Sequence, residues 1–362
     1  MRKINYPSNE NFIEEYYKSF FKKNNKHKLR NTLEVEDINN RLKNIFINNE
    51  YTFKDIVTAE LDKLLEINNC IEHHIQIYIK KKILLECADN EEKKFVNQYF
   101  RNRIDAKTKV NALNGTTNDS KRKNIKTKID LALFDIVAFN KMPYEVKSLS
   151  NEISAFFMNK SKDLKINTCF YCNIDFVNAY TGKDGKSKNQ YTLDHVLPKG
   201  KYPYFSLSLF NLIPSCYTCN SKLKKEKEFT INDGLILLSP SSKKYFFDQK
   251  IKFDLKINLE NEDIDLNNIK PSLINMNNNK GLNEFIDIFQ LRGRYDFHRN
   301  LAQEMVDKRK KYSDTQINEI AKMLSVSENQ VKKDVFGKEL YEESNAPFEK
   351  YKNDIGKELG LV

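Results

Sequence analysis

TCFYCN at residues 168–173 and SCYTCNSK at residues 215–222 each contain a Cys-x-x-Cys motif. One such motif can place two thiolates on a zinc ion, and a second motif closes a tetrahedral four-thiolate site. The sequence therefore predicts a structural zinc ion that leaves no open position for a substrate. Its predicted ligands are Cys169, Cys172, Cys216 and Cys219.

A redox role for the paired cysteines is the alternative, but the motifs lack the βαβ context of a thioredoxin-like protein and flank a single unit. Cysteines in the reducing cytosol are more often metal ligands than disulfides. The remaining two, Cys70 and Cys87, stand alone in helical-looking sequence, where we expect ordinary buried residues.

Between the two motifs, YTLDHVLPKGKYPYF at residues 191–205 places Asp194 beside His195, in a chain with only 5 histidines. Neighbouring strand residues point to opposite faces, so the two side chains can serve different partners. LDHVLP followed by FNLIPSCYTCNSK, inside the cysteine pairs, resembles the HNH nucleases of the ββα-metal superfamily. The resemblance covers about residues 166–230. Many members carry histidine where this chain has Asn220.

This resemblance implies a metal-dependent endonuclease that hydrolyses phosphodiester bonds and leaves a 3′-hydroxyl and a 5′-phosphate. Histidine, whose unperturbed pKa is about 6.5, suits a general base that activates water, and we assign this role to His195. Asp194 and Asn220 offer oxygen ligands for a catalytic Mg²⁺ or Mn²⁺. Asn211 is expected to pin the loop that carries His195.

Lysines on both sides of the motif are candidates for contact with nucleic acid. Lys199 follows the Asp-His pair, and Lys222 lies near the start of the helix expected after Asn220. The other lysines of this segment are interpreted as a solvated helix face: Lys224, Lys225 and Lys227.

The whole chain is expected to be mainly α with a small α+β core. A helical region at residues 1–160 precedes the zinc-stapled HNH module at residues 161–232. Short strands and then helices fill residues 233–362, with strands expected in LILLSP (235–240) and KKYFFDQKIKFDLKINL (243–259). A basic loop is predicted at 111–128 and a helix around 129–140.

Three weaker patterns have ordinary structural alternatives. TGKDGKSK, at 181–188, lacks the glycine spacing of a phosphate-binding loop and predicts a hairpin or exposed loop. Residues 317–337 have the outline of a DNA-binding helix-turn-helix, which two helices packed in a bundle would also give. Arg294, His298 and Arg299 are interpreted as surface groups, with contact to a nucleic-acid backbone as the alternative.

The composition agrees with a polyanionic partner. The sequence holds 61 Lys and Arg against 50 Asp and Glu, a net charge of +11, although a coding bias towards lysine, asparagine and isoleucine would contribute to the same surplus. No apolar stretch approaches the length of a membrane span, and the first residues lack the apolar core of a signal peptide. We therefore expect a cytoplasmic protein without a membrane partner.

DNA is favoured over RNA as the substrate by the habit of the family. The flanks resemble, more loosely, bacterial HNH proteins of anti-phage systems such as Septu and certain retrons, which are encoded beside an ATPase partner. A non-catalytic zinc-dependent nucleic-acid-binding protein is one alternative. A nuclease subunit controlled by a partner ATPase is another, and a homing or restriction enzyme remains open within the nuclease class.

Overall fold

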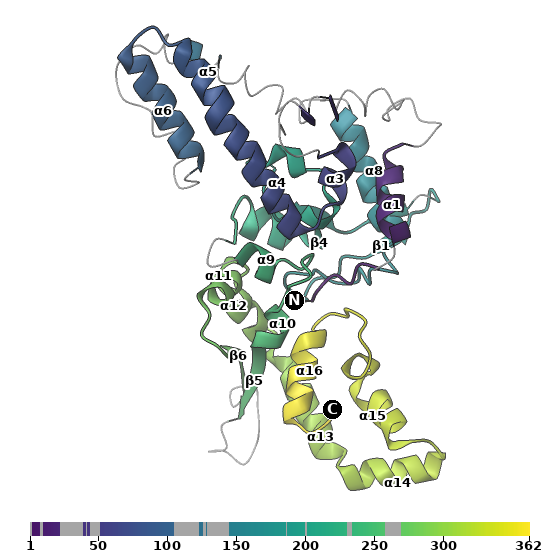
Figure 1. Cartoon of the computed structure of the whole chain (residues 1–362). Coiled ribbons are helices and arrows are strands. Elements are labelled where there is room, and N and C mark those ends of the chain that lie inside the picture. The colour runs from purple at the N-terminus through teal and green to yellow at the C-terminus, as the bar shows by residue number, and fades with distance from the viewer. Residues whose placement is uncertain are drawn as a thin grey trace. The chain divides into compact units, whose positions relative to one another are not determined.

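A computed structural model of the chain describes residues 2–7, 10–21, 39–40, 42–43, 51–104, 123–125, 128, 145–185, 187–199, 201–229, 234–257 and 269–362. Within these residues the chain is mainly helical, with three antiparallel two-stranded sheets (Figure 1). The prediction of a mainly α fold with a small strand content is confirmed. The loop expected at 111–128 lies largely outside the described residues, and the helix expected at 129–140 lies wholly outside them.

The chain divides into two compact units. One unit comprises Met1–Phe12, Ser154–Pro198 and Phe210–Val362, and the other comprises Ile13–Ile153 and Lys199–Leu209. The first unit, called here the cysteine unit, therefore contains both Cys-x-x-Cys motifs and the C-terminal region. The three regions predicted from sequence divide the chain differently. They separate the module predicted at residues 161–232 from the C-terminal region, whereas the cysteine unit contains both.

The second unit, called here the helical unit, is built on helices whose apolar residues recur every three or four positions. Leu64, Ile67, Ile71 and Ile75 follow this spacing and are all buried. Its elements are most of α1 (Glu10–Ser19), α3 (Phe53–Thr58), α4 (Leu61–His74), η1 (Ile75–Ile79), α5 (Lys80–Leu85), α6 (Asn90–Ile104), the first part of α8 (Glu145–Asn159) and η3 (Pro203–Phe205). Cys70 and Cys87 also lie in this unit. We expected both to be buried, but each is only half-buried.

The cysteine unit contains all three sheets. Its strands are β1 (Ala179–Thr181), β2 (Ser187–Asn189), β3 (Thr192–His195), β4 (Leu212–Ser215), β5 (Ile251–Ile257) and β6 (Ile269–Asn275). Its helices are η5 (Thr218–Lys224), α9 (Gly234–Leu238), α10 (Phe247–Lys250), α11 (Lys280–Ile288), α12 (Leu291–Asp296), α13 (Arg299–Lys311), α14 (Asp314–Leu324), α15 (Glu328–Phe336), η6 (Lys338–Leu340) and α16 (Glu349–Glu358); η4 (Leu209–Asn211) lies at its boundary.

Outside the motif, the hairpin alternative for 181–188 is confirmed, one strand prediction is confirmed in part, and the other is wrong. β1 and β2 form the hairpin that the 181–188 segment allowed, turning through Gly185 at a φ of 71°, a conformation that favours glycine. In the predicted 243–259 strand, Ile251–Ile257 form β5, which pairs with β6, but Phe247–Lys250 before it form helix α10, so the prediction is wrong for these four residues. The strand predicted in LILLSP is wrong, because residues 234–238 form helix α9, which packs against α11.

Aromatic rings join the first Cys-x-x-Cys motif to helix α11. Tyr171, which lies inside that motif, stacks on Phe289 with ring centroids 4.5 Å apart. Phe229 and Phe285 stack beside them at 5.4 Å. All four rings are buried, so the motif is part of the core of the cysteine unit.

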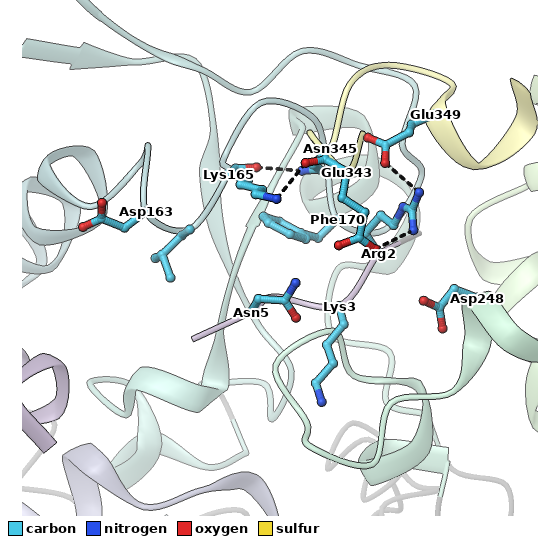
Figure 2. Close-up of a pocket in the computed structure, with 11 residues that line it drawn as sticks. Arg2, Lys3, Asn5, Asp163, Lys165, Phe170, Asp248, Glu343, Asn345 and Glu349 are labelled. Carbon is cyan, nitrogen blue, oxygen red and sulfur yellow. Dashed lines mark hydrogen bonds and ion pairs between the residues drawn. The ribbon is translucent and has the colours of Figure 1, made fainter. Parts of the chain in front are cut away.

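Both ends of the described chain also pack in this unit. Arg2 donates to the carboxylates of Glu343, at 3.3 Å, and of Glu349, at 2.6 Å (Figure 2). A cavity of about 160 Å³ adjoins this pair, next to Phe170 of the first motif. Because Arg2 is paired with these acids, we interpret the cavity as part of the packing of the terminal segment.

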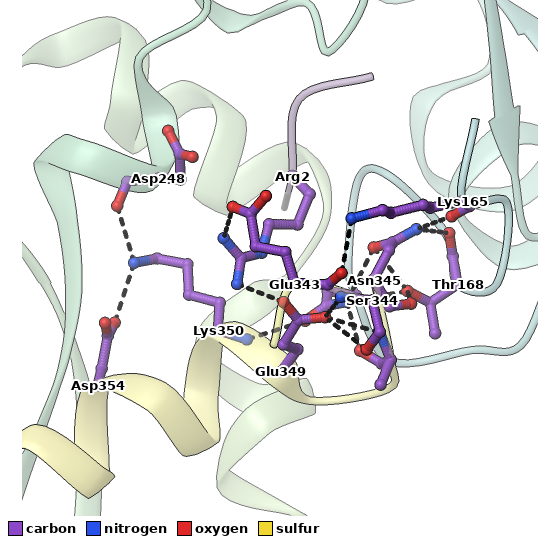
Figure 3. Close-up of polar contacts among 12 residues, drawn as sticks. Arg2, Lys165, Thr168, Asp248, Glu343, Ser344, Asn345, Glu349, Lys350 and Asp354 are labelled. Atoms are coloured by element: carbon purple, nitrogen blue, oxygen red, sulfur yellow. Dashed lines mark hydrogen bonds and ion pairs between the residues drawn. The ribbon is translucent and has the colours of Figure 1, made fainter. Parts of the chain in front are cut away.

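The segment before α16 is held against the first motif by buried polar contacts (Figure 3). The Asn345 side chain donates to the carbonyl oxygens of Lys165 and Thr168 at 3.0 and 3.1 Å. Lys350 lies between the Asp248 carbonyl oxygen at 2.9 Å and the Asp354 carboxylate at 3.0 Å. These bonds satisfy groups that would otherwise be buried without partners.

Candidate functional site

The two cysteine motifs converge on one buried cluster. The Sγ atoms of Cys169, Cys172, Cys216 and Cys219 all lie within 4.8 Å of one another, and all four cysteines are free thiols. Zn–S bonds of about 2.3 Å would place the sulfurs of a tetrahedral site about 3.8 Å apart, so a small contraction of this cluster accommodates zinc. The four cysteines could therefore hold a zinc ion, as the sequence predicted.

The electrostatics of the cluster favour a cation. Burial opposes ionisation of Cys172, but hydrogen bonds from the other three thiols and the charge of Arg294 lower the pKa of Cys172 well below its usual range. Burial, with hydrogen bonding to the other thiols, raises the pKa of Cys219 well above its usual range. The cluster thus resists a second and third negative charge on its own, and a divalent ion would stabilise them.

Arg294 contacts this cluster, so its interpretation as a surface group is wrong. Its guanidinium donates to Cys219 Sγ at 3.3 Å, to Cys172 Sγ at 3.5 Å and to the Asp175 carboxylate at 3.0 Å. The next residue, Tyr295, donates its hydroxyl to the Cys172 carbonyl oxygen at 2.6 Å. Helix α12 therefore holds the first motif through two consecutive side chains.

A strand pair and a helix carry the remaining motif residues. β3 pairs antiparallel with β4, with Asp194 opposite Ile213 and His195 opposite Leu212. η5 starts inside the second cysteine motif and is a π-helix, which is wider than an α-helix. At its end the Lys225 N–H donates to the carbonyl oxygen of Asn220, five residues earlier, at 2.8 Å. The local order is thus strand, strand, helix, with the first cysteine pair before the strands and the second pair at the start of the helix.

Asp194 is buried and hydrogen-bonded on one oxygen. Its Oδ2 accepts from the Tyr171 hydroxyl at 2.6 Å and lies 3.0 Å from the Lys224 Nζ. Burial and the neighbouring Asp194 carboxylate hold the pKa of Tyr171 well above its usual range, so the hydroxyl remains a donor. The interpretation of Lys224 as a solvated residue is wrong, because its side chain is 0% exposed and lies against Asp194. Lys225 and Lys227 are exposed, as expected.

Asn220 lies at the same β3–η5 interface as Asp194. Its Nδ2 donates to the Thr192 Oγ1 at 2.8 Å, and Thr192 shares a face of β3 with Asp194. Lys224 follows Asn220 by four residues on η5 and points to the same interface. As folded, these residues do not fit a divalent cation, because the positive charge beside Asp194 is the Lys224 ammonium.

Asn211 holds the backbone that follows His195. Its Oδ1 accepts from the Leu197 N–H at 2.7 Å, and its Nδ2 donates to the Leu197 carbonyl oxygen at 3.1 Å. The Asn211 carbonyl oxygen also accepts from the Val196 N–H at 3.0 Å. His195 itself is half-buried, and its carbonyl oxygen accepts from Lys224 Nζ at 2.8 Å.

The two predicted nucleic-acid lysines are both exposed and belong to different units. Lys199 begins the short part of the helical unit that spans 199–209. Lys222 lies in the cysteine unit with its Nζ 5.8 Å from the centre of the Tyr217 ring, and Tyr217 is 62% exposed. An exposed aromatic ring beside a lysine suits stacking and phosphate contact.

The helix-turn-helix outline corresponds to α14 and α15. Ser325 joins them in the left-handed conformation, with a φ of 54°, and Val331 is buried between them. Asn329 and Gln330 are exposed at the start of α15. Binding of DNA by this pair of helices stays a prediction, since a packed helical pair has the same geometry.

Comparison with known proteins returned no match: neither a protein family, nor a curated protein, nor a solved structure matches this chain. Within the part of the chain that the structure describes, no helix is long and apolar enough to cross a membrane.

Proposed function

We propose that the chain is an HNH-type endonuclease that hydrolyses phosphodiester bonds of DNA in the presence of Mg²⁺ or Mn²⁺, with His195 as the general base. One observation carries the proposal: β3 and β4 lie in sequence between the two halves of a buried four-cysteine cluster, with Asp194 and His195 ending β3, and η5, which contains Cys219, carries Asn220. The resemblance of the motif to HNH nucleases implies this order.

The contacts around His195 support its role because they hold its carbonyl group and the backbone that follows it. Lys224 bonds its carbonyl oxygen, and Asn211 brackets Leu197 two residues later. A general base must lie within hydrogen-bond reach of the water it activates, so a fixed backbone favours catalysis. In the proposed step His195 accepts a proton from water, the water oxygen bonds to phosphorus as the bond to the 3′ oxygen breaks, and the 3′ oxygen takes a proton from solvent to give the 3′-hydroxyl.

The charge of the protein supports a nucleic-acid substrate. The chain carries a net charge of +11, and the Lys222–Tyr217 pair is exposed on η5 and the turn before it. Contacts of this kind attract the phosphate backbone and do not read the base sequence. They therefore favour binding to DNA in general over binding to one target site. We keep bacterial anti-phage defence as the proposed setting, on the looser resemblance of the flanks alone.

The test is cleavage of supercoiled plasmid DNA by the zinc-loaded full chain, with and without Mg²⁺ or Mn²⁺. Cutting is expected only with the divalent ion, and His195→Ala should slow it by about 10²–10⁴-fold, the usual contribution of a general base. His298→Ala serves as the histidine control, because His298 packs against Phe348 at 4.6 Å outside the motif. Equal rates for His195→Ala and the parent protein would reject His195 as the base.

A non-catalytic zinc-dependent nucleic-acid-binding protein is the second candidate, and the buried Asp194–Lys224 pair favours it, because that pair neutralises the expected metal ligand. Gel shifts without cleavage, in both the parent protein and His195→Ala, would identify this function. A nuclease subunit controlled by an ATPase would instead cut only after that partner is added.

A further inference from the structure

The buried lysine of the motif occupies a special position. Lys224 is 0% exposed, and its Nζ lies 3.0 Å from Asp194 Oδ2 and 2.8 Å from the His195 carbonyl oxygen. Lysine is almost never fully buried unless it is paired, because removing an ammonium from water is costly. Here the same ammonium contacts both residues of the Asp-His pair.

The contacts of Lys224 are those a metal ion would seek. A carboxylate oxygen and a backbone carbonyl oxygen are ligands of hard divalent cations, and Lys224 takes one of each. Asn220, the second expected ligand, precedes Lys224 by four residues on η5 and lies at the same interface with β3. The ammonium therefore supplies, inside the folded chain, the positive charge that the motif would otherwise obtain from a metal.

We propose that Lys224 is a built-in competitor for the divalent cation at Asp194, so that metal binds only as the Lys224 side chain leaves the carboxylate. This inference rests on the proposed function, because it concerns the regulation of the same site. The four-carbon stem of lysine is flexible, so the ammonium can withdraw without unfolding η5. Without metal, the Lys224 ammonium neutralises the Asp194 carboxylate and occupies the place of the ion. The affinity of the site for metal therefore depends on how firmly Lys224 is held.

Titration calorimetry with Mn²⁺ on the zinc-loaded full chain tests this competition, since thiolates prefer zinc and Mn²⁺ reports the oxygen site. Lys224→Met removes the ammonium and keeps most of the stem, and it should bind Mn²⁺ at least about tenfold more tightly than the parent, because the ion no longer has to displace a charged hydrogen bond to Asp194. Lys224→Gln, which keeps a donor for Asp194, should also bind more tightly if Lys224→Met folds poorly. Lys227→Met is the matched control, an exposed lysine of the same segment.

The location of the gain is tested by combining Lys224→Met with Asp194→Asn, which should return Mn²⁺ affinity to the parent value or below. Acylation of the parent protein adds a readout without any variant: Mn²⁺ should increase labelling of Lys224, read by peptide mass spectrometry, and leave Lys227 unchanged. Equal Mn²⁺ affinity in the parent and both Lys224 variants would overturn the proposal, as would a gain that survives Asp194→Asn.

The two proposals fail separately. If the Lys224 variants bind Mn²⁺ more tightly but the parent protein does not cleave plasmid, the competition is supported and the nuclease proposal is contradicted. Metal-dependent cleavage with equal Mn²⁺ affinity in the parent and Lys224 variants supports the nuclease and contradicts the competition.

Discussion

The guanidinium of Arg294 lies 3.3 Å from the Sγ of Cys219, although 75 residues separate the two in sequence. It also reaches Cys172, so a single arginine contacts one cysteine from each motif. Four thiolates around one zinc ion carry excess negative charge, and a neighbouring cation offsets part of it. Arg294 therefore lies where it would act as an outer partner of the four ligands of a zinc ion that this cluster could hold.

Replacing Arg294 by lysine should weaken zinc retention. Lysine keeps the charge but loses the planar fork that reaches two sulfurs and Asp175 at once. Loss of an outer-shell partner typically costs about 10–100-fold in metal affinity, and zinc transfer to a chromogenic chelator should quicken accordingly. Arg292→Lys is the control, because Arg292 lies on the same helix and pairs with Asp287 at 3.0 Å. Equal transfer rates for Arg294→Lys and the parent would reject this role.

Loss of one cysteine ligand should unfold the core of the cysteine unit. Cys169 is fully buried, and its motif neighbour Tyr171 stacks on Phe289. Because metal binding is coupled to folding in such sites, Cys169→Ser should lose stoichiometric zinc and melt several degrees lower, as measured by elemental analysis and thermal unfolding. Cys70→Ser, outside the cluster, should retain both. A chelator should lower the melting temperature of the parent and leave that of Cys169→Ser unchanged.

Removal of the Asn211 side chain should destabilise the segment after His195. Asn211→Ala leaves the N–H and carbonyl groups of Leu197 without these partners in a buried place, at a cost of about 2–4 kcal/mol for the two bonds. Urea unfolding followed by circular dichroism measures the difference. Asn189→Ala, which loses a bond to the Tyr191 carbonyl oxygen at 3.1 Å from a half-buried position, should cost less. Equal losses would mean that Asn211 does not hold this segment.

Sequence spacing predicted the four-cysteine cluster because each Cys-x-x-Cys brings two thiols together locally, and the fold needs only to join two motifs. The order of β3, β4 and η5 was available only through the resemblance to HNH nucleases, because η3 and η4 separate β3 from β4 and no short turn signals their pairing. The apolar run 235–238 was ambiguous by length, and packing against α11 decided for the helix.

Lys224 and Arg294 could not be placed from sequence. A lysine-rich helix normally has a solvated face, and the burial of Lys224 depends on the wide turn of η5, which brings it beside Asp194. Arg294 reaches the cysteines through a contact across the cysteine unit, and nothing near it in sequence indicates a metal partner. In both cases the missing information is long-range packing.

The paired Asp314 should make stability depend on pH in the acid range. Hydrogen bonding to Arg309, whose two guanidinium nitrogens contact the carboxylate at 3.0 and 2.8 Å, lowers the pKa of Asp314 below its usual value. In the window between the lowered folded pKa and the unfolded value of about 3.9, the unfolded chain binds more protons, so stability falls as pH falls. The stabilisation is complete above this window and lost below it.

Urea unfolding of the parent and Asp314→Asn between about pH 2 and about pH 6 measures this effect, because those limits lie roughly two units either side of the unfolded value of about 3.9. The parent should be the more stable at the upper limit, and the two free energies of unfolding should converge towards the lower one. Glu319→Gln, an exposed acid on the same helix, should leave the pH dependence of the parent unchanged. A difference between the parent and Asp314→Asn that stays constant across the range would show that the pair stabilises α14 through something other than the charge of Asp314.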